Sequence, residues 1–199
     1  WFNNEEQGAK VKLRCFQAVF GITLEELQKN AKVYNERYNQ TIRDRVRIID
    51  SAVLTSSSVD RIVASCTDGV GLIVFDQLDK IKGFKDDRQD LELKAIYQWA
   101  RELAKQYAPV IGICQASASA EGKKYLQMDD VDNSKTGKQG EADWILGIGK
   151  LNQQGYESLR HFHLCKNKLI GDKDTIPERR HWQWDVILDA ELARYRDVK

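Results

Sequence analysis

Hydrophobic positions follow two different spacings along the chain, and the alternation between them predicts its helices and strands. Across residues 8–20, apolar side chains recur every three or four positions, which indicates a helix with one buried side. Residues 91–107 repeat this spacing over a longer stretch and predict a second amphipathic helix. Residues 71–75, Gly-Leu-Ile-Val-Phe, are instead a continuous apolar run, as expected of a parallel strand that is buried on both faces.

Shorter elements are predicted between these three. Thr23-Leu-Glu-Glu26 has the sequence of a helix capping box, and it is expected to start a helix that runs to Tyr38 or beyond. A short strand is predicted at residues 46–49. A further strand is expected at residues 110–114, where a second apolar run again indicates burial.

The last third of the chain departs from this pattern. Residues 116–140 are rich in Ser, Gly, Lys and Asp, and they predict mobile loops. Three closely spaced strands follow, at residues 144–148, 159–165 and 181–187. Because their connections are too short for helical crossovers, these strands are expected to be antiparallel. The whole pattern predicts an α/β fold with a mainly parallel central sheet and antiparallel strands at its C-terminal end.

A single domain is expected over residues 1–199, because neither an internal repeat nor an interdomain linker is visible. The chain opens with Trp1-Phe-Asn-Asn, which has the pattern of the end of a buried strand. We therefore expect the sequence to be part of a longer protein.

Composition narrows the classes of protein that remain. Hydrophobic residues make up 42% and charged residues 31%, which is ordinary for a globular domain. The formal net charge is only +1, so any nucleic-acid surface must be a local basic patch. The four cysteines contain no C-x-x-C pair, which suits the cytoplasm, or a host's cytoplasm for a viral protein. No apolar run approaches the ~18 residues of a membrane span, and no membrane partner is expected.

Three residues with phosphate-chemistry side chains follow predicted strands. Asp76 ends the apolar strand, where a carboxylate can hold Mg²⁺ through a water molecule. Glu5, or its neighbour Glu6, follows the opening strand and is a candidate base for activating a water molecule. Gln115 follows the strand at residues 110–114, where an amide can sense a γ-phosphate. Since parallel strands end at one edge of a sheet, these side chains are expected to meet there.

Lys166 and Lys168 form a second candidate site. They alternate along a predicted strand end and therefore point the same way. Two such cations are suited to reach a phosphate across a subunit interface.

The motifs occur in a characteristic order. They are Asn-Asn-Glu-Glu, Leu-Ile-Val-Phe-Asp-Gln, Ile-Cys-Gln, Asp132-x-x-x-Thr-Gly137 with Ala142-Asp143-Trp-Ile-Leu-Gly-Ile, and Lys-x-Lys-x-x-Gly. The set resembles the motor domain of hexameric replicative DNA helicases, the DnaB and phage primase-helicase group of RecA-like ATPases. The resemblance implies a RecA-like three-layer domain that binds ATP and Mg²⁺, assembles into a ring, expected to be a hexamer, and moves along single-stranded DNA.

Carried over by motif, the resemblance implies a role for each candidate residue. Glu5 corresponds to the catalytic base, Asp76 to the magnesium-linked Walker B acid and Gln115 to the γ-phosphate sensor. Lys166 and Lys168 correspond to the cations that reach the neighbouring subunit's nucleotide.

The sequence departs from the family pattern in three places. No G-x-x-x-x-G-K-[ST] loop occurs, so the main phosphate cradle is missing from this sequence and is expected upstream of Trp1. Lys168 stands where the family usually has arginine, and lysine lacks the bidentate fork of a guanidinium. The spacing from Gly137 to Asp143 is about one residue short of the pattern.

The resemblance also implies contacts to DNA and to the nucleotide base. Loops after the Asp76 and Gln115 strands line the central channel in RecA-like motors. In this chain the second loop carries four candidate DNA-binding lysines: Lys123, Lys124, Lys135 and Lys138. Flexible lysines of this kind suit sequence-independent contacts with phosphates. Trp184 is a candidate for stacking on adenine, with core packing as the alternative.

Other interpretations remain open from the sequence. His161, His163 and Cys165 share one face of a strand, which resembles a metal site but lacks a convincing fourth ligand. The whole chain is also compatible with a RecA-like recombinase or regulatory ATPase that does not unwind DNA. A non-catalytic interaction module with the same fold is the third alternative.

Overall fold

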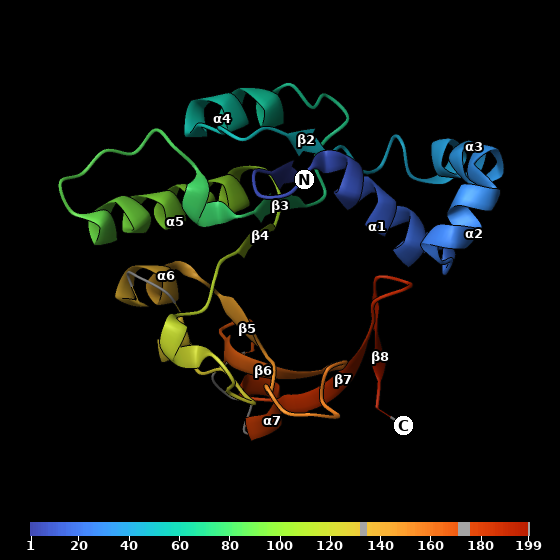
Figure 1. Ribbon diagram of the computed structural model, residues 1–199. Helices are drawn as coiled ribbons and strands as arrows, with labels where there is room; N and C mark the ends of the chain where they lie inside the picture. The colour runs from blue at the N-terminus through green and yellow to red at the C-terminus, as the bar shows by residue number, and fades with distance from the viewer. Residues whose placement is uncertain (132–134, 171–175, 199) are drawn as a thin grey trace.

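The strands form two four-stranded sheets in the computed structural model, which describes residues 1–131, 135–170 and 176–198 (Figure 1). The first sheet is parallel, with strand order β2-β1-β3-β4. Its strands are β1 (Phe2–Asn3), β2 (Ile49–Asp50), β3 (Ile73–Asp76) and β4 (Val110–Ile113). The second sheet is antiparallel, with order β5-β6-β7-β8. Its strands are β5 (Trp144–Gly149), β6 (Leu159–Asn167), β7 (Gln183–Asp189) and β8 (Arg194–Asp197).

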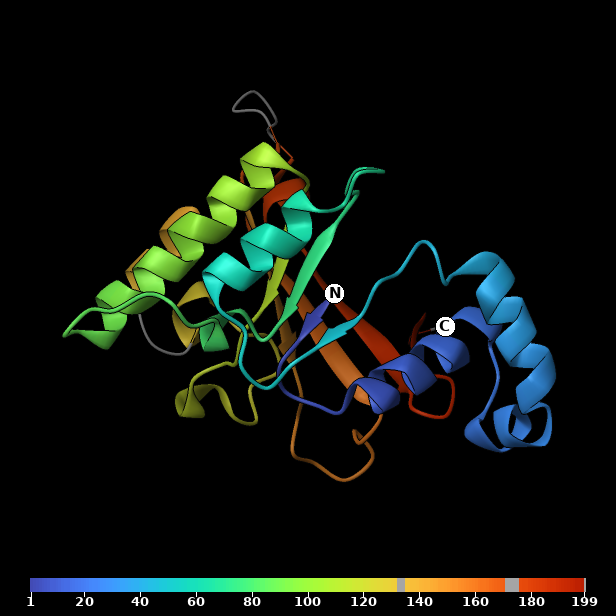
Figure 2. The ribbon, with the colours of Figure 1, turned by 90° about the horizontal axis from the view of Figure 1, so that it is seen from above.

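Two helices, α4 (Ser56–Ala64) and α5 (Gln89–Gln106), pack against the parallel sheet and build the main core with it (Figures 1 and 2). They are amphipathic, so one side of each is buried. Phe75 of β3 lies at the centre of this core, with its ring 5.2 Å from Phe2 and 5.5 Å from Trp99. The predicted helix over residues 91–107 is confirmed as α5.

The first three helices have a core of their own and extend away from the sheets (Figure 2). They are α1 (Gly8–Phe20), α2 (Leu24–Lys29) and α3 (Ala31–Thr41). Thr23 caps α2 as predicted, since its hydroxyl accepts a hydrogen bond from the Glu26 amide at 3.2 Å. The expected single helix to Tyr38 is wrong, because the chain bends at Asn30. The Asn30 side chain bonds the Glu26 carbonyl at 3.3 Å and competes with helix continuation.

The predicted burial of the strand at residues 110–114 is also wrong. Ile111 is 50% exposed and Ile113 is 41% exposed. Both point away from the face that α4 and α5 cover, since their register partners Val74 and Asp76 alternate with the buried Ile73 and Phe75. An apolar run alone does not tell a sequence reader whether the second face is covered.

The antiparallel strands form a sheet of their own rather than an extension of the parallel sheet. The predicted loop region at residues 116–140 contains regular structure as well. It includes 3-10 turns η2 (Ala118–Ala120) and η3 (Met128–Asp130) and helix α6 (Lys135–Glu141). A further short helix, α7 (Pro177–Arg180), precedes β7, and a 3-10 turn, η1 (Leu78–Lys80), follows β3. Within the described part of the chain, no helix is long and apolar enough to cross a membrane.

Candidate active site

The parallel sheet brings the first three candidate residues to one edge. Asn3 at the end of β1 pairs with Asp76 at the end of β3, and Asp76 pairs with Ile113 at the end of β4. Glu5 therefore follows β1 by two residues, and Gln115 follows β4 by two residues. This shared edge is what the sequence pattern predicted.

Two asparagines hold the acidic turn against the end of β3. Asn3 is fully buried, and its amide donates to the Glu6 carbonyl at 2.5 Å and to the Asp50 carboxylate at 2.9 Å. Asn4 bonds both backbone groups of Gln77, at 3.0 Å and 2.5 Å, directly after Asp76. Because the turn is tied to the strand end by these bonds, Glu5 and Glu6 are held beside Asp76.

The electrostatics of this turn are those of an acidic cluster. Burial, followed by the negative charges of Glu5 and Glu6, raises the pKa of Asp76 above its ordinary value. Two surface cations partly offset the charge: Lys80 lies 3.5 Å from Glu5, and Arg14 lies 2.6 Å from Glu6. Carboxylates held together against their mutual repulsion are typical of a site that acts on a cation or a proton.

The residues at this edge fit magnesium bound through water. Asp76 offers hard carboxylate oxygens, the ligand type that Mg²⁺ prefers, and Mg²⁺ commonly keeps several water ligands. Among the residues that the structure describes, no three His, Cys, Asp or Glu side chains converge closely enough to hold a metal by themselves. An ion at this edge would therefore need further oxygens, such as those of a nucleotide's phosphates.

Gln115 lies beyond the end of β4 with an exposed side chain. Its place at the sheet edge agrees with the sequence prediction, and its sensor role stays a prediction.

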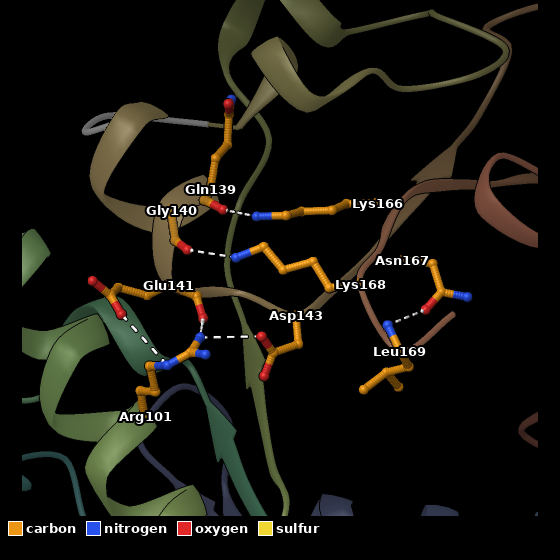
Figure 3. Close-up of polar contacts among 9 residues, drawn as sticks. All are labelled: Arg101, Gln139, Gly140, Glu141, Asp143, Lys166, Asn167, Lys168 and Leu169. Carbon is orange, nitrogen blue, oxygen red and sulfur yellow. Dashed lines mark hydrogen bonds and ion pairs between the residues drawn. The ribbon is translucent and has the colours of Figure 1, made fainter. Parts of the chain in front are cut away.

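Lys166 and Lys168 reach toward the same helix end, as their alternation predicted (Figure 3). The Lys166 ammonium donates to the Gln139 carbonyl, and the Lys168 ammonium donates to the Gly140 carbonyl at 3.1 Å. Burial and the nearby charge of Lys168 lower the pKa of Lys166. Gly171 of the same motif lies outside the described residues.

These lysines also line an open groove of about 530 Å³. Its other lining residues include Met128, Cys165 and Arg180. The groove places a concave, basic surface at the end of β6, on the side of the chain that α6 and α7 border.

Trp184 packs within the antiparallel sheet. It lies opposite Phe162 on the neighbouring strand, with the rings 5.4 Å apart in an edge-to-face arrangement. Phe162 in turn contacts Tyr195 at 5.0 Å, so the three rings form one aromatic cluster. Tyr195 is 48% exposed, and the cluster therefore reaches the surface.

The candidate DNA-binding lysines differ in their surroundings. Lys123 lies 2.6 Å from the buried Asp130, and Lys124 lies 3.3 Å from Asp185. Lys138 is almost fully buried and pairs with Asp79, so its predicted place on a mobile loop is wrong.

Two parts of the same motif cannot be placed. Lys135 begins α6, but its side chain lies outside the described part of the structure. Asp132, from the same motif, also lies outside the described residues.

The His161, His163 and Cys165 side chains share one buried face of β6, as the alternation predicted. His161 bonds Asp185 at 2.7 Å instead of facing the other two. His163 and Cys165 both contact the Leu126 carbonyl, at 2.6 Å and 3.1 Å. These contacts fasten the segment around Leu126 to the antiparallel sheet.

Several residues with clear roles were not found from the sequence. Asn3 and Asn4 shape the acidic turn, and their only signal was an Asn-Asn pair before two acids. Asp79 and Tyr97 surround Lys138, and Arg101 holds the end of α6. These three carry no motif, since their partners lie 18 to 59 residues away along the chain.

The fold and the edge site define a class of protein, a RecA-like domain of the kind found in helicases. The chain superposes on a solved helicase ATPase domain with a TM-score of 0.77 at 12% sequence identity, over 100% of this chain and 73% of that chain. It superposes on a DnaB-like replicative helicase, described with its interactions with primase, with a TM-score of 0.77 at 12% identity. That match covers 100% of this chain and 50% of the other.

No protein family and no curated protein sequence matches the chain. The likeness is therefore one of fold, and it agrees with the α/β class and the RecA-like architecture that the sequence predicted.

Proposed function

We propose that this chain is the motor domain of a phage-type, ATP-dependent replicative DNA helicase. The observation that carries the proposal is the acidic cluster of Glu5, Glu6 and Asp76 at the carboxyl edge of a parallel sheet, in a domain with a helicase ATPase fold. Acids in this position are suited to metal-assisted phosphoryl transfer, which depends on positioning and on charge stabilisation.

In this proposal each residue acts on one part of the reaction. Glu5 accepts a proton from the water molecule that attacks the γ-phosphate, and Asp76 orients a magnesium-bound water. Mg²⁺, when bound with ATP, neutralises charge that develops on the phosphates. Gln115 contacts the γ-phosphate from the end of β4.

The proposed site is completed by a second copy of the chain. Lys166 and Lys168 neutralise phosphate charge on the neighbouring subunit's nucleotide, so the protein works as a ring, and we propose a hexamer. Trp184 and the aromatic rim beside it receive the adenine base. The proposed setting is the cytoplasm, or a host's cytoplasm if the protein is viral.

Single-stranded DNA is the proposed polymer partner. Lys123, Lys124 and Lys135 lie on the segment that follows β4, and they are proposed to contact phosphates along the strand. Lys138 is assigned a different task, since its ammonium is buried inside the domain.

The proposed reaction needs a phosphate-binding loop, and this sequence contains no G-x-x-x-x-G-K-[ST] motif. We therefore propose that residues 1–199 work within a longer protein whose other segments supply that loop. The chain spans about half the length of the DnaB-like helicase that it resembles.

The test is ATP hydrolysis by this longer protein, with and without single-stranded DNA. Glu5→Gln is expected to lower kcat by about a hundredfold or more, because it removes the proposed base. Glu6→Gln is the matched control, since it makes the same change one residue further along, and it is expected to retain most of the activity. If Glu6→Gln is instead the inactive variant, the base is Glu6.

Other outcomes would support the alternatives. Hydrolysis that does not respond to DNA would favour a regulatory ATPase. DNA-stimulated hydrolysis without strand displacement would favour a recombinase. The absence of hydrolysis in the wild type would leave an interaction module.

A further inference from the structure

Helix α6 ends on the two lysines that are proposed to act on the neighbouring nucleotide (Figure 3). The last turn of a helix leaves carbonyl groups without partners inside the helix, and these groups carry partial negative charge. Lys166 and Lys168 bind two of them, the carbonyls of Gln139 and Gly140. Where the end of α6 lies therefore decides where both ammonium groups lie within the chain.

A buried ion pair fixes the other side of α6. The Lys138 ammonium lies 2.5 Å from the Asp79 carboxylate, and the Lys138 side chain is only 3% exposed. Tyr97 of α5 donates its hydroxyl to the same carboxylate at 2.8 Å, and its ring lies 5.6 Å from the ammonium. Separating such a pair would leave a charge buried without its partner, which makes the attachment difficult to break.

Asp79 belongs to η1, which follows β3 directly. It is three residues from Asp76, the acid at the proposed magnesium site. The chain of contacts thus runs from the end of β3 through Asp79 and Lys138 to α6, and from the last turn of α6 to the two lysines.

A second attachment holds the end of α6 to the long helix. Arg101 of α5 donates to the Glu141 carbonyl at 2.5 Å and to the Asp143 carboxylate at 3.1 Å (Figure 3). The Asp143 carbonyl in turn accepts a hydrogen bond from the backbone amide of Lys168 at 2.8 Å. This attachment is partly exposed and therefore weaker than the buried pair.

We propose that Asp79 and Lys138 are positioning residues, which couple the carboxyl end of β3 to the two trans-acting lysines through α6. A shift at the end of β3 moves Asp79, and the buried pair carries α6 along with it. The bonds from Lys166 and Lys168 to the α6 carbonyls lie nearer the surface, so they are the contacts that break when the lysines leave for a neighbouring nucleotide. The inference rests on the proposed function for the role of those lysines.

The first arm of the test uses the chain itself and measures how fast each lysine is acetylated by a brief pulse of an N-hydroxysuccinimide ester, read by peptide mass spectrometry. In Asp79→Asn and in Lys138→Met, Lys166 and Lys168 are expected to react about threefold faster or more, because their hydrogen-bond acceptors move away. The exposed Lys32 on α3 serves as the internal reference.

Asp60→Asn is the matched control. Asp60 also accepts a hydrogen bond from a buried aromatic side chain of α5, Trp99, at 2.9 Å, but it lies on α4 and pairs with no residue of α6 in the described structure. This variant is expected to leave the reactivity of Lys166 and Lys168 unchanged. If Lys138→Met does not fold, Asp79→Asn still decides the result, since its amide keeps an acceptor for Tyr97.

The second arm measures ATP turnover in the longer protein. Both variants are expected to lower kcat while the KM for ATP stays within about twofold, because they displace cations that act on the transition state. Unchanged lysine reactivity in Asp79→Asn and Lys138→Met would overturn the coupling, as would raised reactivity with an unchanged kcat. If the wild type hydrolyses no ATP, the proposed function fails, and the acetylation arm still decides whether α6 positions the lysines.

Discussion

At the scale of single residues, the acidic turn shows that the fold tolerates repulsion at one edge. Asp76, Glu5 and Glu6 carry like charges at the end of β3, and buried amide bonds from Asn3 and Asn4 keep them there. Clusters of this kind are commonly kept for function at a cost in stability.

Replacing Asp76 with asparagine is therefore expected to stabilise the domain. Asp76→Asn should raise Tm at pH 7 by about 1–2 °C, which corresponds to roughly 0.5 kcal/mol for a partly exposed charge in a domain of this size. The pKa of Asp76 is raised in the folded state, so the wild type binds this proton more readily when folded. The wild type consequently loses stability as pH rises through that raised pKa.

The stabilising effect of Asp76→Asn should then shrink as the pH is lowered from 7 toward 4. Thermal unfolding followed by circular dichroism at several pH values measures it. An advantage that is independent of pH would show that charge repulsion at Asp76 is not its cause.

Asn3 is expected to be the most sensitive residue of the same turn. Asn3→Ala removes a fully buried amide and leaves the Asp50 carboxylate and the Glu6 carbonyl without that donor. The expected cost is about 2 kcal/mol, or a fall in Tm of about 4–8 °C. Asn39→Ala on the exposed side of α3 is the control, and equal losses in both variants would contradict the assignment.

At the scale of elements, helix ends are where local sequence had the clearest structural effect. Thr23 caps α2, and Thr55 forms a reciprocal capping box with Ser58 at the start of α4. By contrast, the C-terminal end of α6 is satisfied by lysines from another strand. The first kind of cap lies within four consecutive residues, and the second depends on the tertiary fold.

The capping box of α4 gives a test at this scale. Thr55→Ala is expected to destabilise the domain by about 1 kcal/mol, because the Ser58 amide loses its acceptor at 3.2 Å. Denaturant unfolding with an unchanged m-value measures the loss. Ser57→Ala, in the first turn of the same helix, is the control. A loss in that control as large as in Thr55→Ala would argue against the capping role.

At the scale of the whole molecule, charge is balanced overall and uneven locally. The formal net charge of +1 leaves no general attraction for DNA, and the lysines near β6 and η3 partly pair with acids of the same chain. Any binding of single-stranded DNA by this segment must therefore compete with these internal ion pairs.

The competition is measurable through the salt dependence of DNA binding in the longer protein. Lys123→Gln and Lys124→Gln are each expected to weaken binding of an oligothymidine strand and to reduce the slope of log K against log salt by about 0.7. Lys32→Gln, on α3, should leave the slope unchanged. If neither loop variant changes the slope, the segment after β4 does not contact DNA phosphates.

The sequence by itself determined the features that depend on neighbours along the chain. The spacing of apolar residues located α1 and α5, the Thr23 motif located a cap, and strand-end residues placed Glu5, Asp76 and Gln115 at one sheet edge. Each of these follows from periodicity or from the common direction of parallel strands, which are local rules.

Only the tertiary structure decided the features that join distant residues. It separated the strands into two sheets, exposed one face of β4 and buried Lys138 against Asp79. A lysine in a Gly- and Ser-rich segment has the local pattern of a solvated loop, and it is buried because a carboxylate 59 residues away compensates its charge. Such compensation exists only once the chain has folded, so no local pattern records it.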